Sequence, residues 1–443
     1  MGSINLADEL NYKSIEVKSD SNSAGMDYIV TKVIDYFVNN KPVLINDVEK
    51  GNLPFTAIEK EIEYFIDTND VSLNGITKEK ISENVYNYLY KYYVLQDYLE
   101  DDRVTGMRLI KKNNIWIKKI VNGEPIDLEV SDDINFSSDE SFERFCNYIA
   151  RRNRAEINKK NTINIITDKK RCDNAILRIN LTSDVINSSD LPCVIIRKTP
   201  KEKLLLDDLE KRGMIDYAVK EYLKEKVKAG AQILVCGAGG SGKTYLLNAL
   251  LEEIEDNIHG VFIQESEELY SDKRKNLTFQ RIKKKSSEGD TECNLEQITR
   301  NAMVMSADLI CIGEIKGAEA FDLFNAAYSG HIAWSSLHTE SDVDTLPKLI
   351  QYMQYGHINL DEKRLLEMLS KIDAVIMLQD FKVKELTEIT GFDRVKSEVL
   401  YNKVFKYDYK NEKFKRLNNT CERLQEKVDY YYYKKRRREL CCS

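Results

Sequence analysis

The spacing of hydrophobic residues over the first hundred positions is helical. In the segments 26–38 and 81–99, apolar side chains recur three and four residues apart, which predicts amphipathic helices. Over 106–124 the spacing changes to that of short strands, and the dipeptide Asn122-Gly123 predicts a hairpin turn. Before residue 200 the same reasoning predicts a helix at 139–153 and strands at 162–167, 175–181 and 193–198.

From residue 214 onward, helical and strand patterns alternate. Helical segments at 214–230 and 245–255 alternate with apolar strands at 231–237 and 260–265. Such alternation is typical of a parallel sheet covered by helices, because a connection between parallel strands has to cross the sheet. Further strands are expected at 307–317, 371–379, 383–390 and 399–408. The predicted fold class is therefore α/β, with a parallel-rich sheet preceded by a smaller α/β domain and an N-terminal helical region.

Changes in composition predict how the chain divides. The charged segment 199–213 connects two differently patterned halves, and a charged helix begins near residue 416. The predicted organisation is an N-terminal helical region at 1–98, an α/β N-terminal domain at 99–200, a linker at 201–213, a second α/β domain at 214–415 and a basic C-terminal tail at 416–443.

The composition is that of an ordinary soluble protein, with 42% hydrophobic and 31% charged residues among 443. We expect a cytoplasmic protein, because no apolar run approaches the roughly 18 residues of a membrane-spanning helix and the N-terminal sequence lacks the order of a signal peptide. The nine cysteines lack C-x-x-C spacing and are expected to be reduced. A net charge of −7 does not favour direct nucleic-acid binding.

The segment 233–250, "ILVCGAGGSGKTYLLNAL", predicts a phosphate-binding loop. It contains G-x-x-x-x-G-K-[ST] between an apolar strand and an amphipathic helix, and a chance glycine turn would seldom have both flanks. Glycines let successive N–H groups point at phosphate oxygens, the Lys243 ammonium would reach the β- and γ-phosphates, and the Thr244 hydroxyl would ligate Mg²⁺. The predicted nucleotide-binding residues are Gly237, Ala238, Gly239, Gly240, Ser241, Gly242, Lys243, Thr244 and Tyr245.

The expected nucleotide is ATP. A GTPase normally carries an N-K-x-D motif, and the Asn-Lys pairs of this chain continue instead as "NKPV", "NKKN" and "NKVF". Two apolar strands downstream of the loop end in acids: 307–317 delivers Glu314, and 261–269 delivers Glu265, Glu267 and Glu268. In a parallel sheet the carboxyl ends of the strands face the nucleotide. The alternative for each single acid is a solvated turn, but two acidic strand ends behind a phosphate loop favour a catalytic and metal-binding role.

Four motifs in order resemble those of a known family. They are the phosphate loop, "IQESEEL" at 263–269, "RNAMVMSADLICIGEIKGAEAFDLFNAAYSGH" at 300–331 and "SSLHTES" at 335–341. Together they resemble the secretion and pilus-assembly ATPases of the type II/type IV secretion superfamily, nearest the Tad/CpaF-type branch. The resemblance implies a RecA-like P-loop ATPase domain at 214–415, the cofactors ATP and Mg²⁺, a hexameric ring and an inner-membrane platform protein as partner.

The resemblance also implies roles for individual residues. Glu314 would polarise the attacking water, and Glu265 and Glu268 would hold Mg²⁺ through water beside Thr244. His338 would lie beside the γ-phosphate as a sensor, with His331 supporting the same loop. Two histidines packed in the core remain the alternative, and a zinc pair lacks further ligands at suitable spacing.

Two arginines lie in segments that, by resemblance, form the junction between the domains. Arg178 and Arg197 would complete the ATP site, in some family members across a subunit boundary. Surface salt bridges are the alternative for both residues.

The chain departs from the family pattern at three places. The acidic box reads Gln264-Glu265 where the family usually has Glu-Asp, Lys316 replaces an arginine, and Thr339 follows the second histidine where alanine is usual. A lysine keeps the charge but loses bidentate contact. We therefore expect an active enzyme with slow turnover.

The C-terminal tail carries "YYYYKKRRREL", with five consecutive basic residues at 434–438. It is expected either to be a solvated terminal helix or to dock electrostatically on an anionic membrane surface or an acidic partner, so peripheral membrane association is one expectation. The predicted function is a hexameric ATPase that powers pilus assembly, protein secretion or conjugative transfer. The alternatives are a nucleotide-binding assembly scaffold with little turnover and a DNA-translocating motor.

Overall fold

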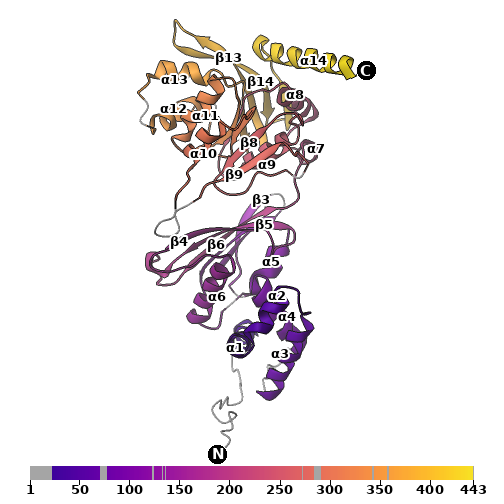
Figure 1. The fold of residues 1–443 in the computed structure, drawn as a ribbon, viewed down its shortest axis with the longest axis vertical. Helices are drawn as coiled ribbons and strands as arrows, with labels where there is room; N and C mark the ends of the chain where they lie inside the picture. Colours follow the sequence, from indigo (N-terminus) through magenta and orange to yellow (C-terminus); the bar gives the residue numbers. More distant parts are fainter. Residues whose placement is uncertain are drawn as a thin grey trace, which may run out of the picture. The chain divides into compact units, whose positions relative to one another are not determined.

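The computed structural model describes residues 22–69, 77–121, 124–131, 133–134, 136–271, 273–283, 291–341, 344–356 and 359–442. The chain forms two compact units, Met1–Glu202 and Lys203–Ser443 (Figure 1). The predicted turn Asn122-Gly123 lies outside the described residues. Among the helices of the described ranges, none is long and apolar enough to cross a membrane.

The first unit begins with helices, as the spacing of apolar residues predicts. The helix expected at 81–99 is interrupted after Tyr90, and Tyr93 adopts a φ of 49°. Adjacent Tyr92 and Tyr93 are both buried, and breaking the helix turns both rings inward. Arg152 donates to the Lys91 carbonyl at 2.6 Å and so satisfies a carbonyl group at the C-terminal end of the interrupted helix. These helices are α1 (Asn22–Asn40), α2 (Pro42–Glu49), α3 (Thr56–Thr68), α4 (Lys78–Tyr90), the 3₁₀ helix η1 (Tyr93–Leu95) and α5 (Gln96–Glu100).

An antiparallel six-stranded sheet completes the first unit, in the order β3-β2-β1-β6-β5-β4. One face packs with α6 (Asp139–Arg152) and the N-terminal helices into a single core. On the other face Arg178 and Arg197 are direct cross-strand partners. The strands and the 3₁₀ turn between two of them are β1 (Val104–Lys111), β2 (Asn114–Val121), β3 (Glu124–Glu129), β4 (Ile163–Asp168), β5 (Ala175–Thr182), η2 (Asp184–Ile186) and β6 (Cys193–Pro200).

The second unit contains a nine-stranded sheet in the order β15-β14-β13-β12-β7-β11-β10-β8-β9. From β12 to β9 the strands pair in parallel, and β13, β14 and β15 add an antiparallel edge. This confirms the predicted parallel-rich α/β fold. The strands are β7 (Ile233–Gly237), β8 (Gly260–Gln264), β9 (Leu277–Arg281), β10 (Leu309–Ile312), β11 (Ile332–Leu337), β12 (Ala374–Gln379), β13 (Lys382–Asp393), β14 (Glu398–Asp408) and β15 (Lys413–Arg416).

Helices cover both faces of this sheet. Alternate residues of β7 enter opposite cores: Ile233 and Val235 pack with α7, α8 and α9, whereas Leu234 and Cys236 pack with α10 to α13. A strand buried on both faces must be continuously apolar, which is the pattern of "ILVC". The helices are α7 (Leu206–Lys211), α8 (Tyr217–Lys228), α9 (Lys243–Leu251), α10 (Leu295–Ala302), α11 (Glu319–Tyr328), α12 (Thr345–Gln354), α13 (Glu362–Leu369) and α14 (Glu422–Cys442).

Two segments expected to connect or extend the domains are packed on the second unit. The predicted linker 201–213 includes α7, whose Leu206 and Leu209 are buried in the core. The predicted tail 416–443 includes α14, which buries Leu424. The other domain limits stay predictions.

Candidate functional site

The phosphate loop joins β7 to α9. Gly237 has a φ of 147°, and a Cβ atom there would collide with the carbonyl oxygen of Leu378. Gly242 has a φ of 101°, and a Cβ atom there would lie 2.8 Å from Met214 Cε and 2.9 Å from Phe381 Cδ2. Both positions therefore require glycine, for backbone conformation and for space. The loop delivers the chain to the N-terminus of α9, where free helix N–H groups favour an anion.

Lys243 folds back over its own loop. Its side chain is buried, and the ammonium donates to the carbonyl oxygens of Gly237 and Ala238, each at 2.9 Å. The same Nζ lies 3.3 Å from Nδ1 of His338. An ammonium can only donate, so Nδ1 accepts and the imidazole proton sits on Nε2. His338 also packs on the loop, since a Cβ atom at Gly239 would lie 3.6 Å from its Cε1.

A line of polar contacts continues from His338 across two further strand ends. His338 Nε2 contacts Glu314 Oε1, and Lys316 Nζ lies 3.0 Å from Glu314 Oε2 and 2.9 Å from Glu265 Oε2. The strands that lead to these residues, β7, β11, β10 and β8, are neighbours in that order. We call the residues Lys243, His338, Glu314, Lys316 and Glu265 the polar chain.

Charge and burial set the protonation of two members of the polar chain. Burial lowers the pKa of His338, and the nearby positive charges of Lys243 and Lys316 lower it further, against the opposing effect of Glu314. Burial also lowers the pKa of Lys316, but hydrogen bonds to Glu265 and Glu314 outweigh it and raise that pKa overall. At neutral pH the chain therefore holds a neutral imidazole between a lysine and a carboxylate.

Two serines of the "SSLHTES" motif fix the position of Glu314. Ser335 Oγ donates to the Ile312 carbonyl and Ser336 Oγ to the Gly313 carbonyl, both at 2.7 Å. In return the Ile315 N–H donates to the Ser336 carbonyl at 2.9 Å. These bonds pair the end of β11 with the loop after β10, so Glu314 and His338 are positioned together.

The hydroxyl of Thr244 donates to Glu268 Oε2 at 3.2 Å. Hydroxyl and carboxylate oxygens are the donors that Mg²⁺ takes, usually with several retained waters, so these residues fit the ion. Glu265 is held instead by Lys316, and Glu267 pairs with Arg281 at 2.9 Å. Of the predicted acids, Glu268 is therefore the one beside Thr244.

The unusual Gln264 organises the acidic loop. Its buried side chain accepts from the N–H groups of Glu268 and Leu269 at 2.8 Å and donates to the Leu269 carbonyl at 3.0 Å. An amide can both accept and donate in this way, whereas a carboxylate could only accept. The departure from the family pattern thus has a structural use.

His331 does not join the polar chain, and its role in supporting the loop of His338 stays a prediction. It precedes β11, whereas His338 follows that strand, and seven residues of extended chain span about 23 Å. His331 lies at the end of α11, where its N–H donates to the Ala326 carbonyl at 3.0 Å and Nδ1 lies 3.2 Å from the same oxygen.

The other residues of the site escaped the sequence reasoning. Lys348 of α12 donates to the His338 carbonyl at 2.5 Å. Phe381, in the two-residue turn between β12 and β13, has a φ of 57° and makes an edge contact with Tyr245 at 5.8 Å. A positive φ is unusual for a bulky residue and commonly marks a functional position. In the sequence, only the short interval between the predicted strands 371–379 and 383–390 indicated a turn near Phe381.

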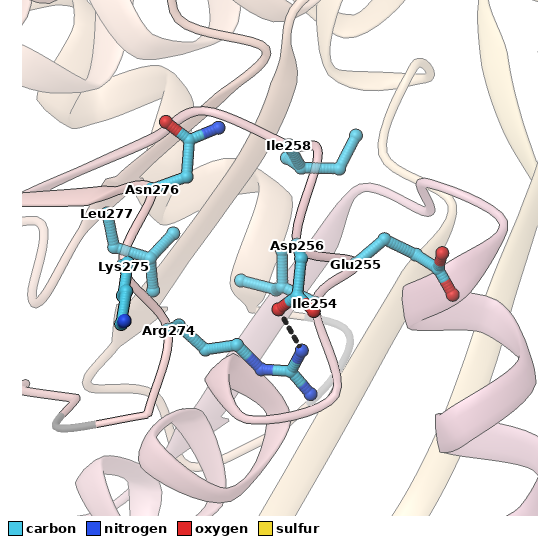
Figure 2. A pocket seen from close by; sticks show the side chains of 8 residues that line it. All are labelled: Ile254, Glu255, Asp256, Ile258, Arg274, Lys275, Asn276 and Leu277. Atoms are coloured by element: carbon cyan, nitrogen blue, oxygen red, sulfur yellow. Dashed lines mark hydrogen bonds and ion pairs between the residues drawn. The ribbon is translucent and has the colours of Figure 1, made fainter.

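A shallow depression lies at the opposite edge of the sheet, where β8 and β9 begin. Figure 2 shows its two walls, residues 254–258 and 274–277, with Arg274 reaching toward Asp256. Arg274 Nη1 lies 2.6 Å from Asp256 Oδ1 and crosses the opening. The depression is thus separate from the phosphate loop.

A parallel sheet whose strand β7 leads into a G-x-x-x-x-G-K-T loop, with catalytic-type side chains on adjacent strand ends, defines a P-loop nucleotide-binding fold of the RecA-like kind. A family model described as "Type II/IV secretion system protein" matches residues 109–380, more than half of the chain. The chain therefore belongs to this family.

Individual relatives match shorter stretches. The type IV secretion system protein PtlH of Bordetella pertussis is 33% identical over 43% of this chain and 56% of its own length. A Mycobacterium tuberculosis protein named for conjugal transfer is 32% identical over 31% of this chain and 39% of its own length. The chain thus matches only about half of these relatives or less. The structure of the Legionella pneumophila ATPase DotB covers 72% of this chain and 80% of that chain, with 17% identity and a TM-score of 0.46.

Proposed function

We propose that this protein is a Mg²⁺-dependent ATP hydrolase that works as a cytoplasmic homo-oligomer, specifically a hexameric ring. It would power pilus assembly, protein secretion or conjugative transfer, with an inner-membrane platform protein as its partner. The observation that carries the proposal is the polar chain, which connects the phosphate-loop lysine to Glu314 through His338. Solvated turns would not bring acidic and basic groups from four adjacent strands into one line of contacts.

Lys243 and Thr244 would bind the phosphates and the metal. Phosphate oxygens compete with the carbonyls of Gly237 and Ala238 for the Lys243 ammonium, so ATP binding would turn this lysine outward from its own loop. Thr244 and Glu268 would hold Mg²⁺ through oxygen and water ligands. When bound, Mg²⁺ neutralises negative charge on the β- and γ-phosphates.

Glu314 would polarise the attacking water, and His338 would report phosphate occupancy to it. The imidazole contacts Glu314 through Nε2 and accepts from Lys243 at Nδ1. A phosphate that draws the Lys243 ammonium away leaves Nδ1 without its donor, which changes how His338 holds Glu314. Lys316, whose Nζ lies 3.0 Å from Glu314 Oε2, would hold the other oxygen of this side chain in place.

Arg178 and Arg197 would complete the ATP site from the first unit. The two residues occupy directly opposed positions of an antiparallel pair and therefore lie on one face of the sheet. Their placement as cross-strand partners supports a shared anionic ligand.

The test is ATP hydrolysis by the purified full chain with Mg²⁺. Lys243→Ala should lower turnover by about 10²-fold or more and weaken ATP binding. Glu314→Gln should lower turnover by about 10²–10⁴-fold while ATP still binds, since only water activation is lost. Glu340→Gln, an exposed acid two residues beyond His338, is the matched control and should retain full turnover.

A scaffold with little turnover is the second candidate. It is favoured by the contacts of Lys316 and His338, which engage Glu314 in this structure. Tight ATP binding with equally negligible turnover in the wild type and in Glu314→Gln would establish the scaffold and contradict the hydrolase. Equal, substantial turnover in both would show that Glu314 is not the base.

A further inference from the structure

Two turns near the C-terminal end of α14, residues 432–439, form a cationic surface that the function above does not use. Residues 432–439 are all exposed, and they include the five basic residues 434–438. Among the described residues, the side-chain contacts of 432–439 stay within α14 itself: Lys434 lies 4.5 Å from the Tyr430 ring centroid, and Arg437 Nη1 lies 3.3 Å from Tyr433 Oη. In Figure 1 the C-terminal end of α14 extends beyond the helices and strands of its unit.

The first half of α14 anchors this surface. Leu424 and Val428 are buried, and Tyr431 donates to Glu255 Oε1 at 2.8 Å. Arg423 and Lys427 reach the buried carboxylate of Asp373, at 3.2 and 2.6 Å. The basic residues of the first half are thus committed to the fold, and those of the second half are available to a partner.

Helical geometry sorts the second half into faces. At 100° per residue, Tyr430, Tyr433, Lys434 and Arg437 share the side of the helix that is turned away from Leu424 and Val428. Tyr430 is 57% and Tyr433 50% exposed. A side that combines cations with exposed tyrosines suits an interface between water and lipid, because phenol rings reside at headgroup level and cations attract anionic lipids.

We propose that this face of α14 docks the protein on an anionic lipid surface. The cationic stretch 432–439 is about 12 Å long, whereas a duplex is usually held through 6–10 phosphate contacts along its backbone. The preceding turns carry three exposed acids, Glu422, Glu426 and Asp429, which would repel a nucleic-acid backbone that continued along the helix. A flat array of lipid headgroups needs only the end of the helix.

Docking by α14 would leave the nucleotide site open. α14 reaches Asp373, which directly precedes β12 and accepts from the N–H of Gln232, the residue before β7. The phosphate loop follows the other end of β7. The inference adds a membrane-facing surface to the proposed motor and depends on that function only for its cytoplasmic location.

The test is sedimentation of the full-length protein with vesicles of phosphatidylcholine alone and of phosphatidylcholine with phosphatidylserine. The wild type should bind only the vesicles that contain phosphatidylserine. Each basic residue near such a surface contributes about 1 kcal/mol, or roughly fivefold, so Lys434→Gln and Arg437→Gln together should weaken binding about 25-fold. The matched control changes two exposed lysines of the same unit, Lys396 and Lys410, to Gln and should bind as the wild type does.

Two further measurements make the outcome decisive. ATP turnover should be the same in both double variants, so a failure of docking is distinguishable from a failure of the proposed hydrolase. Binding of a fluorescent duplex DNA is measured at the same ionic strength. One result would overturn the proposal in favour of a nucleic-acid contact: the wild type binds DNA but no vesicles, and the α14 variant loses the DNA binding. Equal vesicle binding by both variants would show a non-specific charge effect and would also overturn it.

Discussion

Lys243 and His338 are 95 positions apart in the sequence, and the sheet brings their nitrogen atoms to 3.3 Å. A histidine between a lysine and a carboxylate is a sensitive element, because its charge depends on both neighbours. Here burial and the adjacent lysines lower its pKa, so the folded protein favours the neutral imidazole. This protonation state gives Nδ1 and Nε2 opposite hydrogen-bonding roles and lets one ring contact both partners.

The lowered pKa of His338 predicts a pH-dependent stability. The unfolded chain binds this proton more tightly than the folded protein, so protonation favours unfolding as the pH falls below the ordinary histidine value of about 6.5. The Tm of the wild type should therefore fall more steeply between about pH 7 and pH 5 than the Tm of His338→Gln, measured by calorimetry. His331→Gln controls for the loss of an imidazole elsewhere in the unit. Parallel Tm profiles for the wild type and His338→Gln would contradict the assignment.

Local sequence predicted the phosphate loop but not its surroundings. Its glycines and lysine are consecutive, so their spacing alone indicates the turn and the anion site. The strand β11 separates His331 from His338. Its residues, "IAWSSL", were not predicted to form a strand. The use of Gln264 as a clamp depends on backbone groups four and five residues further on, which no composition rule reveals. Phe381 is near Gly242 only because β12 lies beside β7.

At the scale of elements, continuous apolar runs and turn residues predicted the strands β7, β8, β10, β12, β13 and β14. Their order in the sheet was beyond sequence reasoning, because each parallel strand could pair with several others. This strand order determines the site. The neighbouring strands β7, β11, β10 and β8 lead, in that order, to the successive residues of the polar chain. In the first helical region the apolar spacing predicted too long a helix. The spacing continues through 81–99, but the helix breaks where adjacent Tyr92 and Tyr93 are both buried.

The attachment of α14 rests on a buried carboxylate. Asp373 accepts from the Gln232 N–H at 2.7 Å and from Lys427 of α14 at 2.6 Å, and it forms an ion pair with Arg423 of α14 at 3.2 Å. Asp373→Asn would leave Arg423 and Lys427 beside a neutral group, and we expect it to lower the free energy of unfolding by about 2–3 kcal/mol, less than a fully buried pair because both cations are partly exposed. Hydrogen exchange should show faster opening of α14 than in the wild type.

The matched control for this prediction is Glu426→Gln. Glu426 is an exposed acid on the same helix, and it lies on the side turned away from Leu424. Its substitution changes the net charge by the same amount but leaves the attachment intact, so α14 should exchange as in the wild type. Equal exchange of α14 in the Asp373→Asn variant and this control would show that apolar packing alone holds the helix.

At the scale of the whole molecule, the residues proposed to act in the motor are divided between two compact units. The phosphate loop and Glu314 belong to the second unit, and Arg178 and Arg197 to the first. In a ring built from heterologous contacts, each subunit can offer its arginines to a neighbour's ATP site. Turnover should then rise cooperatively with protein concentration, because a single subunit would hold an incomplete site.

Mixing two inactive variants tests this arrangement. The Arg178→Ala, Arg197→Ala double variant and Lys243→Ala should each hydrolyse little ATP alone. If the arginines act on the neighbouring subunit, an equal mixture assembled from separated subunits should regain turnover at roughly a quarter of the sites, those that pair an intact phosphate loop with intact arginines. The control mixes Lys243→Ala with Glu314→Gln, whose residues meet through His338 in one unit, so no mixed site can be whole. If the mixture that contains the arginine variant shows no turnover, the arginines act on the ATP bound in their own subunit. Full activity of the arginine variant alone would remove them from the reaction altogether.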